Sequence, residues 1–171
     1  MNALKIYSFD PVIQSNPRAL ILGSMPGKRS LEMQQYYAHP QNAFWCIMGE
    51  LFGFAADLPY PQRLDRLTER GIALWDVLHS CERAGSLDTA IQMEVPNDLP
   101  GLLAGRLGIR LICCNGGKSW SAFHRHILPR LSAERLAALE LRRLPSTSPA
   151  NARLSYAQKL ELWQSVLEDV I

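Results

Sequence analysis

Short apolar runs alternate with longer amphipathic stretches along the 171-residue chain. The apolar runs lie at residues 19–23 (ALILG), 72–78 (IALWDVL), 109–115 (IRLICCN) and 139–144 (LELRRL). A short continuous apolar run bounded by turn residues is typical of a strand that is covered on both faces. The pattern therefore predicts four short buried strands.

Helical periodicity fills the intervals between these runs. From Asn42 onward, apolar residues recur at helical spacing as far as Gly53, and Pro61 and Gly71 bracket a second helix. Further helices are expected over 97–108, after the glycines at 116–117, and over 156–171, where Leu160, Trp163, Leu167 and Ile171 form one stripe. Strands that alternate with helices predict a three-layer α/β/α domain with a short, mainly parallel four-stranded sheet. We expect residues 1–171 to form one such domain.

Three loops follow the carboxyl ends of predicted strands: the loop after Gly23, the loop after Asn115 and the loop after Leu144. In open parallel sheets the ligand crevice lies beyond these strand ends. The sequence therefore predicts that these loops meet around one site.

Composition narrows the class of protein only slightly. The net charge of +2 and the 20% of charged residues do not by themselves indicate a nucleic-acid-binding protein, so any basic surface must come from local placement. The four cysteines form no C-x-x-C pair, and we interpret all of them as reduced core residues of a cytoplasmic protein. The first residues lack the apolar segment of a signal peptide, and no run is long enough to span a bilayer.

Common catalytic motifs fit poorly. The GSMPG turn has neither P-loop nor dinucleotide-fold spacing, and the GKS at 117–119 has Ile112 where a P-loop needs its first glycine. The histidines lack partners at metal-ligand spacing, and no G-x-S-x-G elbow surrounds Ser24. What remains is a crevice of amides, hydroxyls and aromatic rings, which suits a flat, hydrogen-bonding ligand such as a nucleobase.

Four segments together carry a resemblance to a known family. GSMPGKRSLEMQQYYAHPQNAFW, GIALWDVLHSCERAGSLDTAI, LICCNGGKS and LPSTSPANA resemble, in this order, the motif regions of the uracil-DNA glycosylase superfamily. They are most similar to the hypoxanthine (deoxyinosine) DNA glycosylase group. The resemblance implies an enzyme that flips a deaminated base out of DNA and hydrolyses its N-glycosidic bond.

The resemblance also implies roles for the residues around the base. The loop from Gly23 through Ser24 and Met25 would lie along C1′, with its backbone amides near the base. Tyr37 would stack on the flipped base, or alternatively only pack on the following helix. Asn115 would read the Watson–Crick edge with its amide, or alternatively open the turn that follows it.

The same resemblance implies a DNA-binding surface. Ser146, Thr147 and Ser148 match a motif that enters the minor groove. The position of the side chain that fills the vacated stack falls on Ala150, which is too small, so Asn151, Arg153 or a residue of another loop would act in its place. Basic residues beside the loops, Lys28 and Lys118, are further candidates for DNA contacts.

Met25 is the main departure from the related enzymes. Mismatch-specific relatives have a catalytic Asn at this position, and a thioether can neither orient nor deprotonate water. In the deoxyinosine group the Asn of the HPQN segment is the catalytic candidate, which is Asn42 here. Asn42 would position the water, with His39 as the second candidate; the alternative for Asn42 is a helix-capping role.

Alternatives remain open. The chain could be a mismatch-specific uracil/thymine glycosylase, an inactive module that binds lesions or nucleotides, or an α/β protein that acts on free nucleotides. We expect a monomer that binds double-stranded DNA, with single strands as a further possible substrate, and no membrane partner. The spacing of the four cysteines argues against an iron–sulfur cluster, so no cofactor or metal is expected.

Overall fold

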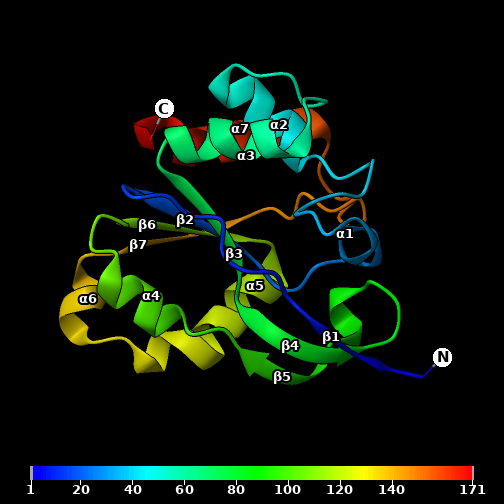
Figure 1. Ribbon diagram of the computed structural model, residues 1–171, viewed down its shortest axis with the longest axis horizontal. Coiled ribbons are helices and arrows are strands. Elements are labelled where there is room, and N and C mark those ends of the chain that lie inside the picture. The colour runs from blue at the N-terminus through cyan, green and yellow to red at the C-terminus, as the bar shows by residue number, and fades with distance from the viewer. Residues whose placement is uncertain (1, 171) are drawn as a thin grey trace.

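A computed structural model describes residues 2–170 and contains two β-sheets with helices around them (Figure 1). The strands are β1 (Leu4–Tyr7), β2 (Ala19–Gly23), β3 (Ile72–Asp76), β4 (Leu78–Arg83), β5 (Gln92–Pro96), β6 (Leu111–Asn115) and β7 (Glu140–Leu144). The α-helices are α1 (Lys28–Met33), α2 (Phe44–Phe52), α3 (Tyr60–Glu69), α4 (Leu99–Gly105), α5 (Gly117–Ala122), α6 (Ala133–Ala137) and α7 (Tyr156–Leu167). Shorter helical turns are η1 (Asp88–Ala90), η2 (Phe123–Ile127), η3 (Leu128–Arg130) and η4 (Glu168–Val170).

The central sheet has four parallel strands in the order β3-β2-β6-β7. Strands β2 and β6 lie in the middle of the sheet, and every residue of both is buried. This burial explains why both strands are continuous apolar runs in the sequence, since helices cover the two faces of the sheet. The predicted four-stranded parallel sheet is confirmed.

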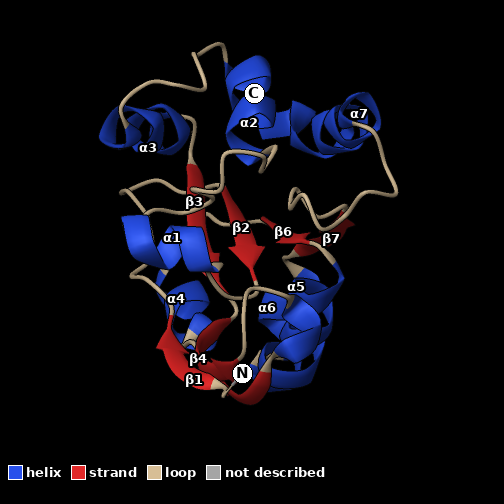
Figure 2. Cartoon of the chain, turned by 90° about the vertical axis from the view of Figure 1, so that its right-hand side faces the viewer, coloured by secondary structure: helices blue, strands red, loops and turns tan. Residues whose placement is uncertain are grey.

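Helices form a layer on each face of the sheet (Figure 2). Helices α2, α3 and α7 cover one face, where Phe44 and Trp163 are completely buried in the core. Helices α4, α5 and α6 lie on the other face, where Leu103, Phe123 and Ile127 are also completely buried. The predicted three-layer arrangement is therefore confirmed.

The antiparallel sheet β1-β4-β5 was not expected from the sequence. The run at 72–78, predicted as one strand, is divided: β3 ends at Asp76 and β4 begins at Leu78 in the other sheet. The chain turns at Val77, whose N–H donates to the carbonyl of Gly23 at 2.8 Å. An apolar run cannot reveal such a turn, because Val77 and Leu78 remain buried after it.

Two expectations about helices need correction, and a third is only partly within the described residues. The loop after Gly23 contains helix α1, and the helix predicted after Gly117 breaks into α5, a π-helical turn and a 3₁₀ turn. Pro129 lies in that last turn and has no N–H to continue an α-helix. The predicted C-terminal stripe packs through Trp163 and Leu167, whereas Ile171 lies outside the described residues.

The cysteines are free thiols, but only three of the four are core residues. Cys81, Cys113 and Cys114 are buried, whereas Cys46 is exposed on α2, which corrects the prediction that all four belong to the core. Within residues 2–170, no helix is long and apolar enough to cross a membrane.

Candidate active site

A cavity of about 1190 Å³ lies at the carboxyl ends of the parallel strands. The loops after Gly23, Asn115 and Leu144 all line it, as predicted from the strand ends. The complete lining comes from Asp76 and from segments within 23–32, 36–42, 86–89, 115–117 and 143–153.

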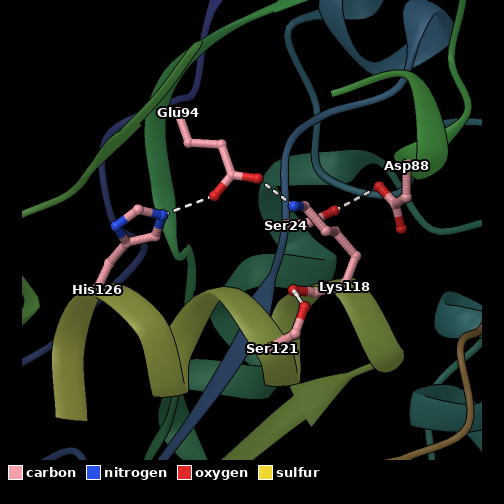
Figure 3. A network of polar contacts seen from close by, with 6 residues as sticks. All are labelled: Ser24, Asp88, Glu94, Lys118, Ser121 and His126. Atoms are coloured by element: carbon pink, nitrogen blue, oxygen red, sulfur yellow. Dashed lines mark hydrogen bonds and ion pairs between the residues drawn. The ribbon is translucent and has the colours of Figure 1, made fainter. Parts of the chain in front are cut away.

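Nearly all of the predicted site residues line this cavity. They are Gly23, Ser24, Met25, Lys28, Tyr37, His39, Asn42, Asn115, Ser146, Thr147, Ser148, Asn151 and Arg153. Lys118 is not among the lining residues. Its ammonium group pairs with Glu94, whose second carboxylate oxygen lies 2.6 Å from His126 Nε2 (Figure 3). The structure therefore places Lys118 in an ion-pair network rather than at the candidate site.

The first loop is held in place from several directions. Ser24 Oγ donates to Asp88 Oδ1 at 2.6 Å (Figure 3), and Arg83 Nη2 donates to the carbonyl of Pro26 at 2.6 Å. At Gly23 a Cβ atom would overlap Asp76 Oδ1, and Tyr37 Oη would be 3.4 Å away. The backbone at residue 23 can lie this close to Asp76 only because the residue is glycine.

Met25 contributes mainly to the core. Its side chain is 7% exposed and belongs to the apolar cluster on the α4–α5 face of the sheet, although it reaches the cavity wall. Met25 is thus a packing residue, and its thioether can neither orient nor deprotonate water.

Tyr37 lines the cavity and has a left-handed backbone conformation, which is uncommon for a residue other than glycine. Its backbone has φ +56°, and one face of the ring stacks on Phe44 with a centroid distance of 4.0 Å and an angle of 24° between the planes. Its hydroxyl is buried and has no hydrogen-bond partner in the described part of the chain. Burial also raises the pKa of Tyr37 above its ordinary value, so the phenol stays protonated. Packing on the helix therefore occupies one face of the ring, and a base could stack only on the other.

Asn42 precedes helix α2 by two residues and borders the cavity. Its Oδ1 accepts a hydrogen bond at 3.0 Å from the N–H of Phe44, the first residue of α2, whose N-cap position is Ala43. Its Nδ2 has no acceptor within residues 2–170 and remains available to a ligand or water. His39 lies beside it: its carbonyl accepts from Asn42 N at 2.9 Å, and its Nδ1 accepts from Gln41 N at 3.1 Å.

Asn115 is engaged with the last loop. Its Nδ2 donates to Thr147 Oγ1 at 2.9 Å, and its Oδ1 accepts from Thr147 N at 3.0 Å. Thr147 in turn accepts from Ala43 N at 3.0 Å through its carbonyl, which connects the loop to the start of α2. The amide predicted to read a base therefore holds two of the cavity's loops together.

Asp76 is a site residue that sequence reasoning missed. It ends β3 at the cavity wall and is only 3% exposed. Burial is the main reason that the pKa of its carboxyl is raised to about 7. The hydrogen bond from Ser8 and the charge of Arg83 oppose this rise, and the negative charge of Asp88 adds to it. Asp76 could have been found by the rule that ligand sites lie beyond the carboxyl ends of parallel strands. The prediction of a single strand over 72–78 placed Asp76 inside the strand rather than at its end.

A metal centre is not evident in the part of the chain that the structure describes. No group of three or more His, Cys, Asp and Glu side chains is arranged there to hold a metal ion.

Comparison with known proteins agrees with this geometry. Residues 11–170 match the family model described as uracil DNA glycosylase superfamily. A protein of Methanosarcina acetivorans named hypoxanthine DNA glycosylase is 38% identical over 159 residues, which is 92% of this chain and 95% of that protein. A protein of the same name from Methanosarcina barkeri is 36% identical over 157 residues, or 91% of this chain and 94% of that one.

A solved structure extends the likeness to three dimensions. The solution NMR structure of a candidate uracil DNA glycosylase from Methanosarcina acetivorans superposes with a TM-score of 0.82 at 35% identity. The superposition covers 98% of this chain and 99% of the other. The family match, the curated relatives and the shared fold agree over nearly the whole length, and the chain belongs to the uracil DNA glycosylase superfamily.

Proposed function

We propose that this protein is a DNA glycosylase that hydrolyses the N-glycosidic bond of deaminated bases in DNA, hypoxanthine first and uracil second. The observation that carries the proposal is the cavity at the strand ends, which has a free side-chain amide, an aromatic ring and a close glycine turn in its wall. The relatives named hypoxanthine DNA glycosylase, similar over more than nine-tenths of the chain, support this choice of substrate.

Hydrolysis of the N-glycosidic bond depends more on the position of the base and of a water molecule than on a strong acid or base in the site. The glycosidic bond is inaccessible inside the duplex, so the nucleotide must rotate out of the stack into the cavity. The electron pair of the C1′–N bond leaves with the base, the oxygen of a water molecule bonds to C1′, and the net reaction adds one hydrogen to the base. Because the transition state resembles an oxocarbenium ion, a well-placed neutral water is a sufficient nucleophile.

Within this proposal Asn42 positions the water. Its free Nδ2 borders the cavity, and its Oδ1 is fixed by Phe44 N, so the side chain is already oriented. His39 is the second candidate because its exposed ring lies on the same loop. The backbone from Gly23 to Gly27 lies along the sugar, and the free face of Tyr37 stacks on the base.

Residues at the rim would hold the DNA. Lys28 and Arg153 bring positive charge to phosphates, and Ser146, Ser148 and Asn151 supply hydrogen bonds. Thr147 is buried and shapes the loop instead. We propose a monomer as the active form.

Base release from defined duplexes tests the proposal. The protein is incubated with duplexes that carry one deoxyinosine, one deoxyuridine or one mismatched thymine, and alkali then breaks the strand at abasic sites. We expect breaks at deoxyinosine and slower breaks at deoxyuridine. Binding without breaks on any of the three would instead indicate an inactive lesion-binding module, and faster cleavage at mismatched thymine would indicate a mismatch-specific enzyme.

A further inference from the structure

Leu87 lies in the connection between β4 and β5, at the rim of the cavity. Its side chain is 58% exposed, and no other large apolar side chain in the described part of the chain is both exposed and part of the cavity lining. The other large aliphatic side chains of the lining, Met25 and Leu144, are buried. Single exposed leucines are common on protein surfaces, and Leu87 differs from the others by its place at the cavity.

The residues on both sides of Leu87 are attached to the loop after β2. Ser86 Oγ accepts a hydrogen bond from Lys28 N at 2.9 Å. Asp88 Oδ1 accepts from Ser24 Oγ at 2.6 Å (Figure 3). The backbone of Leu87 is therefore held between two anchors while its side chain stays exposed. A side chain on such a fixed backbone loses less conformational entropy when a partner covers it.

The loop after β7 borders the same cavity but has no comparable side chain. Its apolar residues over 145–153 are prolines and alanines, which are short. A nucleotide that rotates out of a duplex leaves a gap between the flat, apolar faces of the neighbouring bases. Proteins that unstack DNA frequently insert an apolar side chain such as leucine into a gap of this kind. Leu87 has the size and the exposure that such a gap requires.

We propose that Leu87 enters the duplex from the β4–β5 connection and fills the space that the flipped base leaves in the stack. This inference rests on the proposed glycosylase function. Burial of the leucine between the neighbouring bases offsets part of the cost of unstacking and opposes the return of the nucleotide. Because Ser86 and Asp88 are bonded to the loop proposed to lie along the sugar, insertion of Leu87 brings that loop into place at the same time.

Single-turnover release of hypoxanthine from a duplex with one deoxyinosine gives the first test. We expect Leu87→Ala to slow this release by about 10- to 100-fold, the range that corresponds to the burial of one leucine side chain. Leu87→Met keeps the length and the apolar character of the side chain and should be nearly as fast as the unmodified protein. The control Leu107→Ala removes a leucine that is 68% exposed and does not line the cavity, and its rate should be unchanged.

Two further substrates separate the filling of the gap from a general effect on the loop. One is the deoxyinosine strand without its complement, which has no base-pair stack to fill. The other is a duplex with a pyrene nucleoside opposite the deoxyinosine, in which the pyrene itself occupies the gap. Leu87→Ala should therefore release hypoxanthine from both substrates at the rate of the unmodified protein.

Several results would overturn the inference while leaving the proposed function intact. They are an unchanged rate of Leu87→Ala on the ordinary duplex, an equal loss on all three substrates, or a duplex-specific loss with rescue by pyrene in Asn151→Ala or Arg153→Ala instead. If the unmodified protein does not act on single strands, the pyrene duplex alone decides the question. Absence of base release by the unmodified protein from every substrate would instead contradict the proposed function itself.

Discussion

At the scale of single residues, the proposed site takes its amide from Asn42. Met25, expected from the resemblance to stand where mismatch-specific enzymes have their Asn, packs in the core, while Asn42 borders the same cavity from another loop. Asn42 Oδ1 also accepts from the first N–H of α2, so the side chain supports the start of this helix as well as bordering the cavity. A single Ala substitution would therefore mix two effects, loss of the amide and loss of this hydrogen bond.

Two substitutions at Asn42 separate these effects. Asn42→Ser keeps an oxygen that can accept from Phe44 N, whereas Asn42→Ala does not, so only the Ala variant should lose stability, by about 1 kcal/mol. Both remove the amide, and we expect both to slow single-turnover release of hypoxanthine by roughly 100-fold. Rates are measured with excess enzyme, and stability by urea unfolding.

The neighbouring Gln41→Ala is the matched control, because its exposed side chain does not line the cavity. Its rate should equal that of the unmodified protein. Full activity in Asn42→Ser would remove Asn42 from the mechanism and direct attention to His39.

Gly23 sets how closely the loop approaches Asp76. A Cβ at Gly23 would overlap Asp76 Oδ1, so Gly23→Ala should displace a buried carboxyl and lower the free energy of unfolding by about 1–3 kcal/mol. In the control Gly27→Ala the nearest atoms lie 4.0 Å away, and stability should change little. Urea unfolding of both variants measures the difference; equal stability would show that Asp76 does not press against this glycine.

At the scale of elements, the hydrogen bonds between β6 and the loop after β7 organise the cavity. Asn115, at the end of β6, bonds twice to Thr147, and Thr147 bonds to Ala43 before α2. These contacts hold the loop with Ser146 and Ser148 beside the loop with Asn42. Asn115 is therefore better described as a positioning residue than as a base reader.

A double-mutant cycle measures this connection. Asn115→Ala leaves the N–H of buried Thr147 without a partner and should cost about 1–3 kcal/mol of unfolding free energy. Thr147→Val removes the other bond. Because the residues share these bonds, their effects should fall short of additive by about 1 kcal/mol in urea unfolding. As a control, the effects of Asn115→Ala and of Ser165→Ala, on the exposed side of α7, on the free energy of unfolding should be additive. Additive effects of Asn115→Ala and Thr147→Val would contradict the coupling of Asn115 and Thr147 through their hydrogen bonds.

Elements with uniform burial were predictable, and elements with mixed burial were not. The sequence of β2 predicted a central strand because all five of its residues are buried. Strands β1 and β5 are largely exposed, with alternation too weak to recognise, so the antiparallel sheet was missed. Because this sheet was missed, two parts of the cavity wall were missed as well: the segment around Asp88, which connects β4 to β5, and the strand end at Asp76.

At the scale of the whole molecule, parallel topology explains why the sequence could predict the site. Loops separated by about a hundred residues meet because the strands before them end at one edge of the sheet. Lys118 was the exception, since its position near a glycine-rich turn could not reveal that its side chain pairs with Glu94. The side-chain partners depend on the tertiary fold, which local spacing does not specify.

The position of Arg153 predicts how binding responds to salt. Arg153 is exposed at the cavity rim and forms no ion pair within residues 2–170. If it contacts a phosphate, Arg153→Ala should reduce the slope of log binding constant against log salt by about 1. Arg66, on α3, pairs with Glu69 and does not line the cavity, so Arg66→Ala should leave the slope unchanged. Fluorescence anisotropy with a labelled duplex measures both; equal slopes would place the DNA elsewhere.

Hydrolysis of a deaminated base from DNA in the cavity at the strand ends can be measured directly. The most direct test is to quantify, by mass spectrometry, the free base released from a duplex with one deoxyinosine, together with the abasic sites that remain. We expect one free hypoxanthine for each abasic site, with the strand intact until alkali is added, and about 100-fold slower release by Asn42→Ser. Tight binding of the duplex without any free hypoxanthine would contradict it.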